Sequence, residues 1–100
     1  MYRRFIYLIM FSLVFSQTTG KISGIVKDKS DSSFLPGANV YLENTSFGAA
    51  SDEQGRFTLI NIPPGRYILK VDMIGYKSVK MENIIVSVNR TFSLDLELEQ

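Results

Sequence analysis

The 100-residue chain contains no histidine, no cysteine and no tryptophan. Without histidine and cysteine, the common nucleophile–base pairs cannot form, and nearly all zinc sites lack their usual ligands. We therefore expect a protein that is not an enzyme, with no catalytic residue, no metal site and no cofactor. The lack of cysteine also excludes disulfide bonds, so side-chain packing must hold the fold together.

Acidic side chains are present, but their positions do not favour acid–base catalysis or metal binding. Asp52 and Glu53 fall in a predicted turn, and the three acidic residues of 91–99 share the outward face of the last predicted strand. Carboxylates that act as acid and base need surroundings that desolvate one of them, and these positions are solvated. The polar segment 28–33 offers oxygen ligands for Ca²⁺, but no bidentate Glu follows it at a useful spacing. We interpret it as a solvated loop.

The chain has no excess of charge of either sign, with 11 basic and 10 acidic residues and a formal net charge of +1. Removal of Arg3 and Arg4 with the leader described below changes the formal net charge to −1. Binding to nucleic acid requires a basic face, so we expect no nucleic-acid partner.

The one long apolar run lies at the N-terminus. A short basic start, Met1 to Arg4, is followed by residues 5–15, which are apolar except for Ser12. This pattern predicts a secretory signal peptide over residues 1–16, cut after Ser16, and a single domain over residues 17–100. The apolar run would cover roughly 16 Å of a hydrocarbon layer about 30 Å thick, so we expect no transmembrane helix in the mature chain.

After the leader, apolar residues alternate with polar ones and no helical period appears. The alternation predicts strands at 21–28, 39–43, 47–51, 56–59, 67–73, 77–81, 84–88 and 91–99, with a break at Glu82-Asn83. The last strand is the most regular, and Phe57, Tyr67 and Phe92 are expected to face the core. Seven or eight short strands between Gly, Pro and Asn turns predict an all-β fold, an antiparallel β-sandwich with Greek-key connections.

Turn residues separate these strands. We expect Asp52 to bind its own backbone two residues on, and Gly55 to take the positive φ that closes this turn. Pro64 and Gly65 predict a tight turn between two strands that form a hairpin or an arch. The residues expected to shape turns are Pro36, Gly37, Asp52, Gly55, Pro64, Gly65 and Gly75.

Four aromatic residues fall in loops or on outward positions, namely Phe34, Tyr41, Phe47 and Tyr76. They are candidates for a stacking platform that would bind the ring of a glycan. The alternative, which we favour, is that they close the ends of the sandwich or pack on a neighbouring domain.

Six short motifs together resemble one known family, the carboxypeptidase regulatory-like domain, which is a seven-stranded transthyretin-like sandwich. They follow the family's order at close to its spacing, over residues 20 to 90. The motifs are Gly24–Asp28, Leu35–Val40, Asn44–Gly48, Ser51–Phe57, Ile62–Tyr67 and Ile74–Tyr76. Three departures are small: the loop after Asp28 lacks the usual Thr-Gly, Ser51 replaces a common Thr, and Ala49-Ala50 replace small polar residues.

The resemblance implies a non-catalytic domain. In this family it often follows the signal peptide of large TonB-dependent outer-membrane receptors, ahead of the plug and barrel. We therefore expect a chain exported to the periplasm or outer membrane of a Gram-negative bacterium, in contact with other domains of such a receptor. Two alternatives remain: a carbohydrate-binding module of an exported protein, and an accessory domain of a secreted peptidase.

Overall fold

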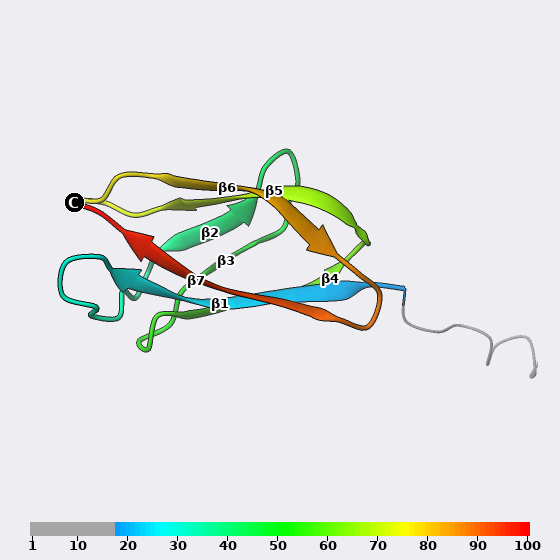
Figure 1. The fold of residues 1–100 in the computed structure, drawn as a ribbon, viewed down its shortest axis with the longest axis horizontal. Coiled ribbons are helices and arrows are strands. Elements are labelled where there is room, and N and C mark those ends of the chain that lie inside the picture. The colour runs from blue at the N-terminus through cyan, green and yellow to red at the C-terminus, as the bar shows by residue number, and fades with distance from the viewer. Residues whose placement is uncertain (1–17) are drawn as a thin grey trace, which may run out of the picture.

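Seven strands form two packed sheets in the computed structural model, which describes residues 18–100 (Figure 1). The three-stranded sheet has the order β4-β1-β7, built from β1 (Gly20–Asp28), β4 (Arg56–Ile62) and β7 (Thr91–Leu98). The four-stranded sheet has the order β3-β2-β5-β6, built from β2 (Asn39–Leu42), β3 (Gly48–Ala50), β5 (Gly65–Asp72) and β6 (Val79–Val86). The prediction of an all-β sandwich of seven strands is confirmed. The predicted leader, residues 1–16, lies outside the described residues.

The core lies between the two sheets and is built from the inward positions of the alternation. Phe57 of β4 illustrates the packing: it is buried, and a Cβ on the opposite Gly24 would lie 2.8 Å from its ring. Gly24 therefore leaves the space that the phenyl ring fills. Tyr67 and Phe92 are partly buried against the same cluster. The buried apolar residues are Ile22, Val26, Leu35, Ala38, Val40, Leu42, Phe57, Leu59, Ile62, Leu69, Val71, Ile84, Val86, Leu96 and Leu98.

The pairing of β1 with β7 departs from a purely antiparallel sandwich. The two strands run parallel, in one register from Lys21 opposite Thr91 to Asp28 opposite Leu98. The cause is the path of the chain, which leaves β6 in the other sheet and enters β7 at the same end of the sandwich at which it enters β1 (Figure 1). At that end the Lys21 amide donates to the Arg90 carbonyl, at 3.0 Å.

A β-bulge replaces the predicted break at Glu82-Asn83. Val79 to Val86 form a single strand, and its register with β5 shifts between Tyr67 and Leu69. Asn83 lies in the bulge and has a φ of 60°, a conformation that asparagine tolerates. The bulge keeps Ile84 and Val86 in the core, whereas Val88 lies beyond the strand and is exposed.

The stretch 52–67 contains a turn and an arch. Asp52 Oδ1 accepts hydrogen bonds from the amides of Gln54 and Arg56, both at 2.9 Å, and Gly55 has a φ of +71°. The chain then passes from β4 in one sheet to β5 in the other, so the connection is an arch rather than a hairpin. The tight turn expected at Pro64-Gly65 is wrong in detail. Gly65 already opens β5 and does not have a positive φ. The left-handed residue nearby is Asn61, with a φ of 57°, which lies within β4 where the register with β1 shifts.

The described part of the chain holds strands and turns, and the other expected strands are found with small shifts of their ends. The strand expected at 47–51 is β3, at the end of the four-stranded sheet. Within residues 18–100, no helix has the length and apolar character needed to span a membrane.

Candidate contact surface at one end of the sandwich

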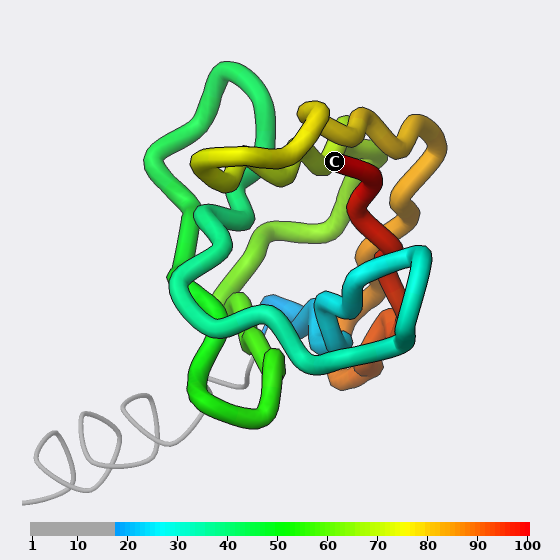
Figure 2. Tube along the Cα trace, turned by 90° about the vertical axis from the view of Figure 1, so that its left-hand side faces the viewer, coloured from blue at the N-terminus to red at the C-terminus, as the bar shows by residue number. Residues whose placement is uncertain are grey.

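Three segments far apart in the sequence meet at one end of the sandwich, which we call the loop end. They are the β1–β2 loop (29–38), the β5–β6 turn (73–78) and the last residues after β7, and Figure 2 looks onto this end. Two backbone hydrogen bonds join them: the Lys29 amide donates to the Leu98 carbonyl at 2.9 Å, and the Lys77 amide donates to the Glu99 carbonyl at 2.7 Å. The end of β7 is therefore held by both loops.

Asp28, the last residue of β1, is the centre of the loop end and is buried. Its Oδ1 accepts hydrogen bonds from the Ser30 amide at 2.8 Å and the Ser30 hydroxyl at 2.6 Å. Its Oδ2 accepts a hydrogen bond from the Tyr76 hydroxyl at 2.7 Å. The Tyr76 oxygen in turn accepts one from Gln100 Nε2 at 3.3 Å. One carboxylate thus joins the β1–β2 loop, the β5–β6 turn and the end of the chain.

The ionisation of this cluster suits a structural role. The Ser30 hydroxyl, and after it the Tyr76 hydroxyl, hold the pKa of the Asp28 carboxyl below its ordinary value. The same carboxylate raises the pKa of the Tyr76 phenol. At neutral pH the acid stays charged and the phenol stays protonated, which moves both groups away from the range useful for general acid–base catalysis.

Apolar side chains lie exposed at this hydrogen-bonded end. Ile74, at the tip of the β5–β6 turn, is 100% exposed, and Phe34 of the β1–β2 loop is 50% exposed. The turn is fixed by Gly75, which has a φ of +88°, and by a hydrogen bond from the Tyr76 amide to the Met73 carbonyl at 3.1 Å. An exposed isoleucine on an ordered turn is the kind of side chain that a partner surface would cover.

Ser51 stabilises the second half of the β1–β2 loop by hydrogen bonds. The sequence pattern did not predict this role. It is buried, accepts a hydrogen bond from the Ala38 amide at 2.9 Å, and donates one to the Leu35 carbonyl at 2.6 Å. These bonds bracket the turn at Pro36 and Gly37, where Gly37 has a φ of +79°. Nothing local marks Ser51, because its partners lie more than ten positions away.

Asp28 was also missed, since the polar segment 28–33 was interpreted as a solvated loop. The rest of that segment is exposed, but Asp28 is not. A signal was available: an Asp followed two residues later by Ser often accepts that residue's amide. Its burial depends on Tyr76, which no local pattern connects to it.

Two of the four aromatic candidates, Phe34 and Tyr76, belong to the loop end, and the other two, Tyr41 and Phe47, lie on or next to the paired strands β2 and β3. Phe34 lies under the Lys27 ammonium, 5.8 Å from the ring centroid, and Tyr76 belongs to the Asp28 cluster. Phe47 is partly buried against the core, and Tyr41 lies on β2 with its hydroxyl bonded to Asp72. Among the described residues, no hydrogen bond joins two of the four side chains, and the stacking platform stays a prediction.

Tyr41 contributes to a smaller polar cluster on the four-stranded sheet. Asp72 accepts hydrogen bonds from the Tyr41 hydroxyl at 2.8 Å and from the Ser78 hydroxyl at 2.5 Å. The Ser78 hydroxyl, followed by that of Tyr41, lowers the pKa of Asp72, and the Asp72 carboxylate raises the pKa of Tyr41. An open groove of about 400 Å³ adjoins the cluster, lined by Gly37, Asn39, Asp72, Met73, Ile74 and Ser78.

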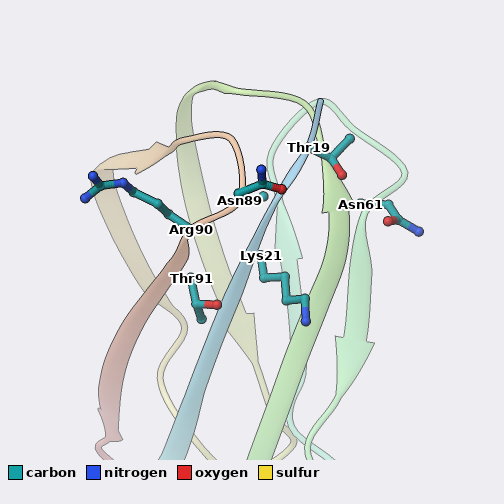
Figure 3. A pocket seen from close by; sticks show the side chains of 7 residues that line it. Thr19, Lys21, Asn61, Asn89, Arg90 and Thr91 are labelled. Carbon is teal, nitrogen blue, oxygen red and sulfur yellow. The ribbon is translucent and has the colours of Figure 1, made fainter. Parts of the chain in front are cut away.

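A polar pocket of about 200 Å³ lies at the opposite end, where the chain enters β1. Figure 3 shows its lining side chains pointing in different directions, with Arg90 and Asn61 turned to opposite sides. No set of groups converges on one point, so the pocket offers no defined binding chemistry. Within residues 18–100, the acidic side chains also form no group of three or more that would hold a metal ion.

The comparisons with known proteins agree with the fold. A family model described as the CarboxypepD_reg-like domain matches residues 22–100. The chain belongs to this family. No curated protein matches the chain closely enough to count as a relative.

Solved structures similar to this CarboxypepD_reg-like domain share the fold at low sequence identity. A type II cohesin–X-dockerin complex from Acetivibrio cellulolyticus matches with a TM-score of 0.67 and 18% identity, over 79% of this chain and 56% of the other. The major pilin subunit BcpA of Bacillus cereus matches with a TM-score of 0.61 and 23% identity, over 82% and 30%. A putative carbohydrate binding protein from Bacteroides uniformis matches with a TM-score of 0.60 and 10% identity, over 78% and 40%. The matched region therefore covers between 30% and 56% of the length of these three proteins.

Proposed function

We propose that this CarboxypepD_reg-like domain is a non-catalytic module that makes protein contacts at the cell envelope. In this proposal it is exported to the periplasm of a Gram-negative bacterium and forms the N-terminal extension, or a fragment, of a TonB-dependent outer-membrane receptor for nutrient uptake. The predicted leader over residues 1–16 and the family match over residues 22–100 support the export and the domain type.

The observation that carries the proposal is the fully exposed Ile74 on an ordered turn of the loop end. The buried carboxylate of Asp28 holds this turn through a hydrogen bond from Tyr76. A partner that covers Ile74 would therefore lose little conformational entropy in ordering the turn. Asp28 and Ser51 are the buried polar side chains among the described residues, and both form hydrogen bonds with loop groups. These bonds support a role in holding the shape of the loops rather than a role in catalysis.

Site-specific photo-crosslinking tests this role. A photoreactive amino acid would replace Ile74 in the protein produced in its own bacterium, and Ile85 would be the matched control because it is an isoleucine 52% exposed on β6, away from the turn tip. We expect envelope fractionation of the protein, and cross-links from position 74 to receptor plug or barrel sequence. Cytoplasmic fractionation, or equal cross-linking from both positions, would contradict the proposal.

The gene sequence beyond Gln100 gives an independent test. A TonB box and plug would support the receptor assignment. A zinc-peptidase domain would instead favour the accessory role in a secreted peptidase.

A second candidate function is glycan binding, favoured by the groove beside the Tyr41–Asp72–Ser78 cluster. Carboxylate, amide and hydroxyl groups line this groove, and such groups bind sugar hydroxyls. Tyrosine fluorescence would follow titration with a panel of oligosaccharides, since the chain has no tryptophan. A saturable change that is lost in Tyr41→Phe would support this function, and no response across the panel would remove it.

A further inference from the structure

The outer edge of β7 is an unprotected strand edge. β7 is the last strand of its sheet, and all eight of its residues pair with β1 in one unbroken register. Edge strands are usually shortened, bulged or given lysine to prevent pairing with other chains. The other three edges follow this rule: β3 has three residues, β4 pairs with an irregular register, and β6 has a bulge and Lys80.

Acidic residues line this edge on the face turned away from the core. Asp95, Glu97 and Glu99 alternate with the buried Leu96 and Leu98. The ion pairs among residues 18–100 are Lys70 with Glu43 and Lys80 with Glu82, so none of the three acids has a cationic partner there. Lys27 lies opposite Glu97 on β1, but its ammonium lies over the ring of Phe34.

The inward residues of the first half of β7 are incompletely covered. Phe92 and Leu94 pack against the core but remain partly exposed, whereas Leu96 and Leu98 are buried. A further strand beside β7 would cover the open side of both residues. The edge thus presents free backbone groups, an acidic row on one face and apolar surface on the other.

We propose that the β7 edge binds an extended, basic segment of a partner protein by strand addition. The segment would pair its backbone with β7, with lysine or arginine facing Asp95 and Glu97, and with the alternate apolar side chains facing Phe92 and Leu94. Backbone pairing would supply affinity, and the two alternating rows would supply register and specificity. This inference deepens the proposed role in protein contact and rests on it.

A second copy of the chain fits the edge less well. Antiparallel pairing of two β7 strands would bring the acidic rows of both copies together, and like charges that face each other across strands are destabilising. The same charges that disfavour self-pairing favour a basic strand.

Binding of designed peptides to residues 18–100, which hold all seven strands and the whole core, tests the inference. The probe is an eight-residue peptide of alternating Lys and Val, equal in length to β7. The controls are an alternating Glu and Val peptide and a peptide of the same Lys and Val content with the two residue types in separate blocks. Amide chemical shifts and amide hydrogen exchange report the site.

We expect saturable binding of the alternating Lys peptide, with shift changes and slowed exchange concentrated at Thr91 to Leu98. The block peptide should bind about tenfold more weakly, because it cannot place charges and apolar side chains on separate faces. Glu97→Lys should weaken binding about three- to tenfold, since it replaces an attractive cross-strand pair by a repulsive one. Glu53→Lys makes the same charge change at an exposed position in the 52–55 turn and should leave binding unchanged.

Four results would overturn the inference. They are shifts centred on another surface, equal binding of the alternating and block peptides, equal losses in the two lysine variants, and dimerisation of the free protein through β7. Each of these would leave the cross-linking result at Ile74 intact, so failure of strand addition is distinguishable from failure of the contact role.

Discussion

Replacement of Gly55 by alanine tests how the turn after Asp52 is fitted to β1. Gly55 has a φ of +71°, and a Cβ there would lie 2.5 Å from the carbonyl oxygen of Val26 and 3.3 Å from the amide nitrogen of Leu35. Gly37 has a similar φ of +79°, but its Cβ would meet nothing within 4 Å. The two glycines therefore share the conformational strain and differ in the steric contact.

The expected loss of unfolding free energy follows from these two terms. A left-handed conformation costs a non-glycine residue about 1–2 kcal/mol, so Gly37→Ala should lose about that amount. In Gly55→Ala the added methyl group must displace backbone of β1, and overpacking of this kind costs about 1–3 kcal/mol more. The total for Gly55→Ala is about 2–5 kcal/mol, and Gly55→Val should lose at least as much.

Urea unfolding followed by tyrosine fluorescence and circular dichroism would measure both variants. Alanine reduces the entropy of the unfolded chain equally at the two positions, so that contribution cancels in the comparison. The matched variant Gly75→Ala, with a φ of +88° and nothing within 4 Å, should behave like Gly37→Ala. Equal losses of unfolding free energy in Gly55→Ala and Gly37→Ala would show that the contact with the Val26 carbonyl adds no destabilisation, and would refute the reasoning.

Three further predictions concern the buried polar groups and the leader. Ser51→Ala should lose about 1–3 kcal/mol, because it leaves two buried backbone groups without a partner, whereas Ser51→Thr keeps the hydroxyl and should lose less in the same urea assay. Tyr76→Phe should raise the pKa of Asp28 toward its ordinary value, as followed by carboxyl NMR titration; an unchanged titration would place the cause in Ser30 alone. Because the folded pKa of Asp28 is lowered, its stabilising effect is present above about pH 3.9 and is lost as the pH falls through the folded value, so wild type and Tyr76→Phe should converge in stability in acid. Mass spectrometry of the exported protein should show Gln17 as the first residue, and retention of the leader would contradict the predicted cleavage after Ser16.

Local alternation was sufficient to predict most of the core residues that lie in strands, but not Leu35 and Ala38 of the β1–β2 loop. Residues such as Val40 and Leu42, or Leu96 and Leu98, follow a period of two and are buried as expected. The turn at Asp52 and Gly55 was equally accessible, since the acceptor and the left-handed residue are close neighbours in the sequence.

The features that were not predicted depend on residues distant in sequence. The direction of β7 relative to β1 is set by a crossover between sheets, and alternation within each strand carries no information about it. The bulge at Asn83 looked like a strand end because a polar pair interrupts the pattern in both cases. Asp28 and Tyr76 lie 48 positions apart, and only the closed fold brings them together.

The parallel pairing of β1 and β7 is what connects the two surfaces of interest. It places Leu98 opposite Asp28, so the carboxylate that orders the β5–β6 turn lies directly beside the end of β7. The Lys29 amide, directly after β1, binds Leu98 on the side of β7 that faces β1, and the Lys77 amide, from the β5–β6 turn, binds Glu99, one residue beyond β7. An edge strand that is held firmly by its neighbours and left unpaired on its outer side has already lost most of the conformational entropy that strand addition would otherwise cost. The same cluster that presents Ile74 therefore also prepares β7 for a partner strand.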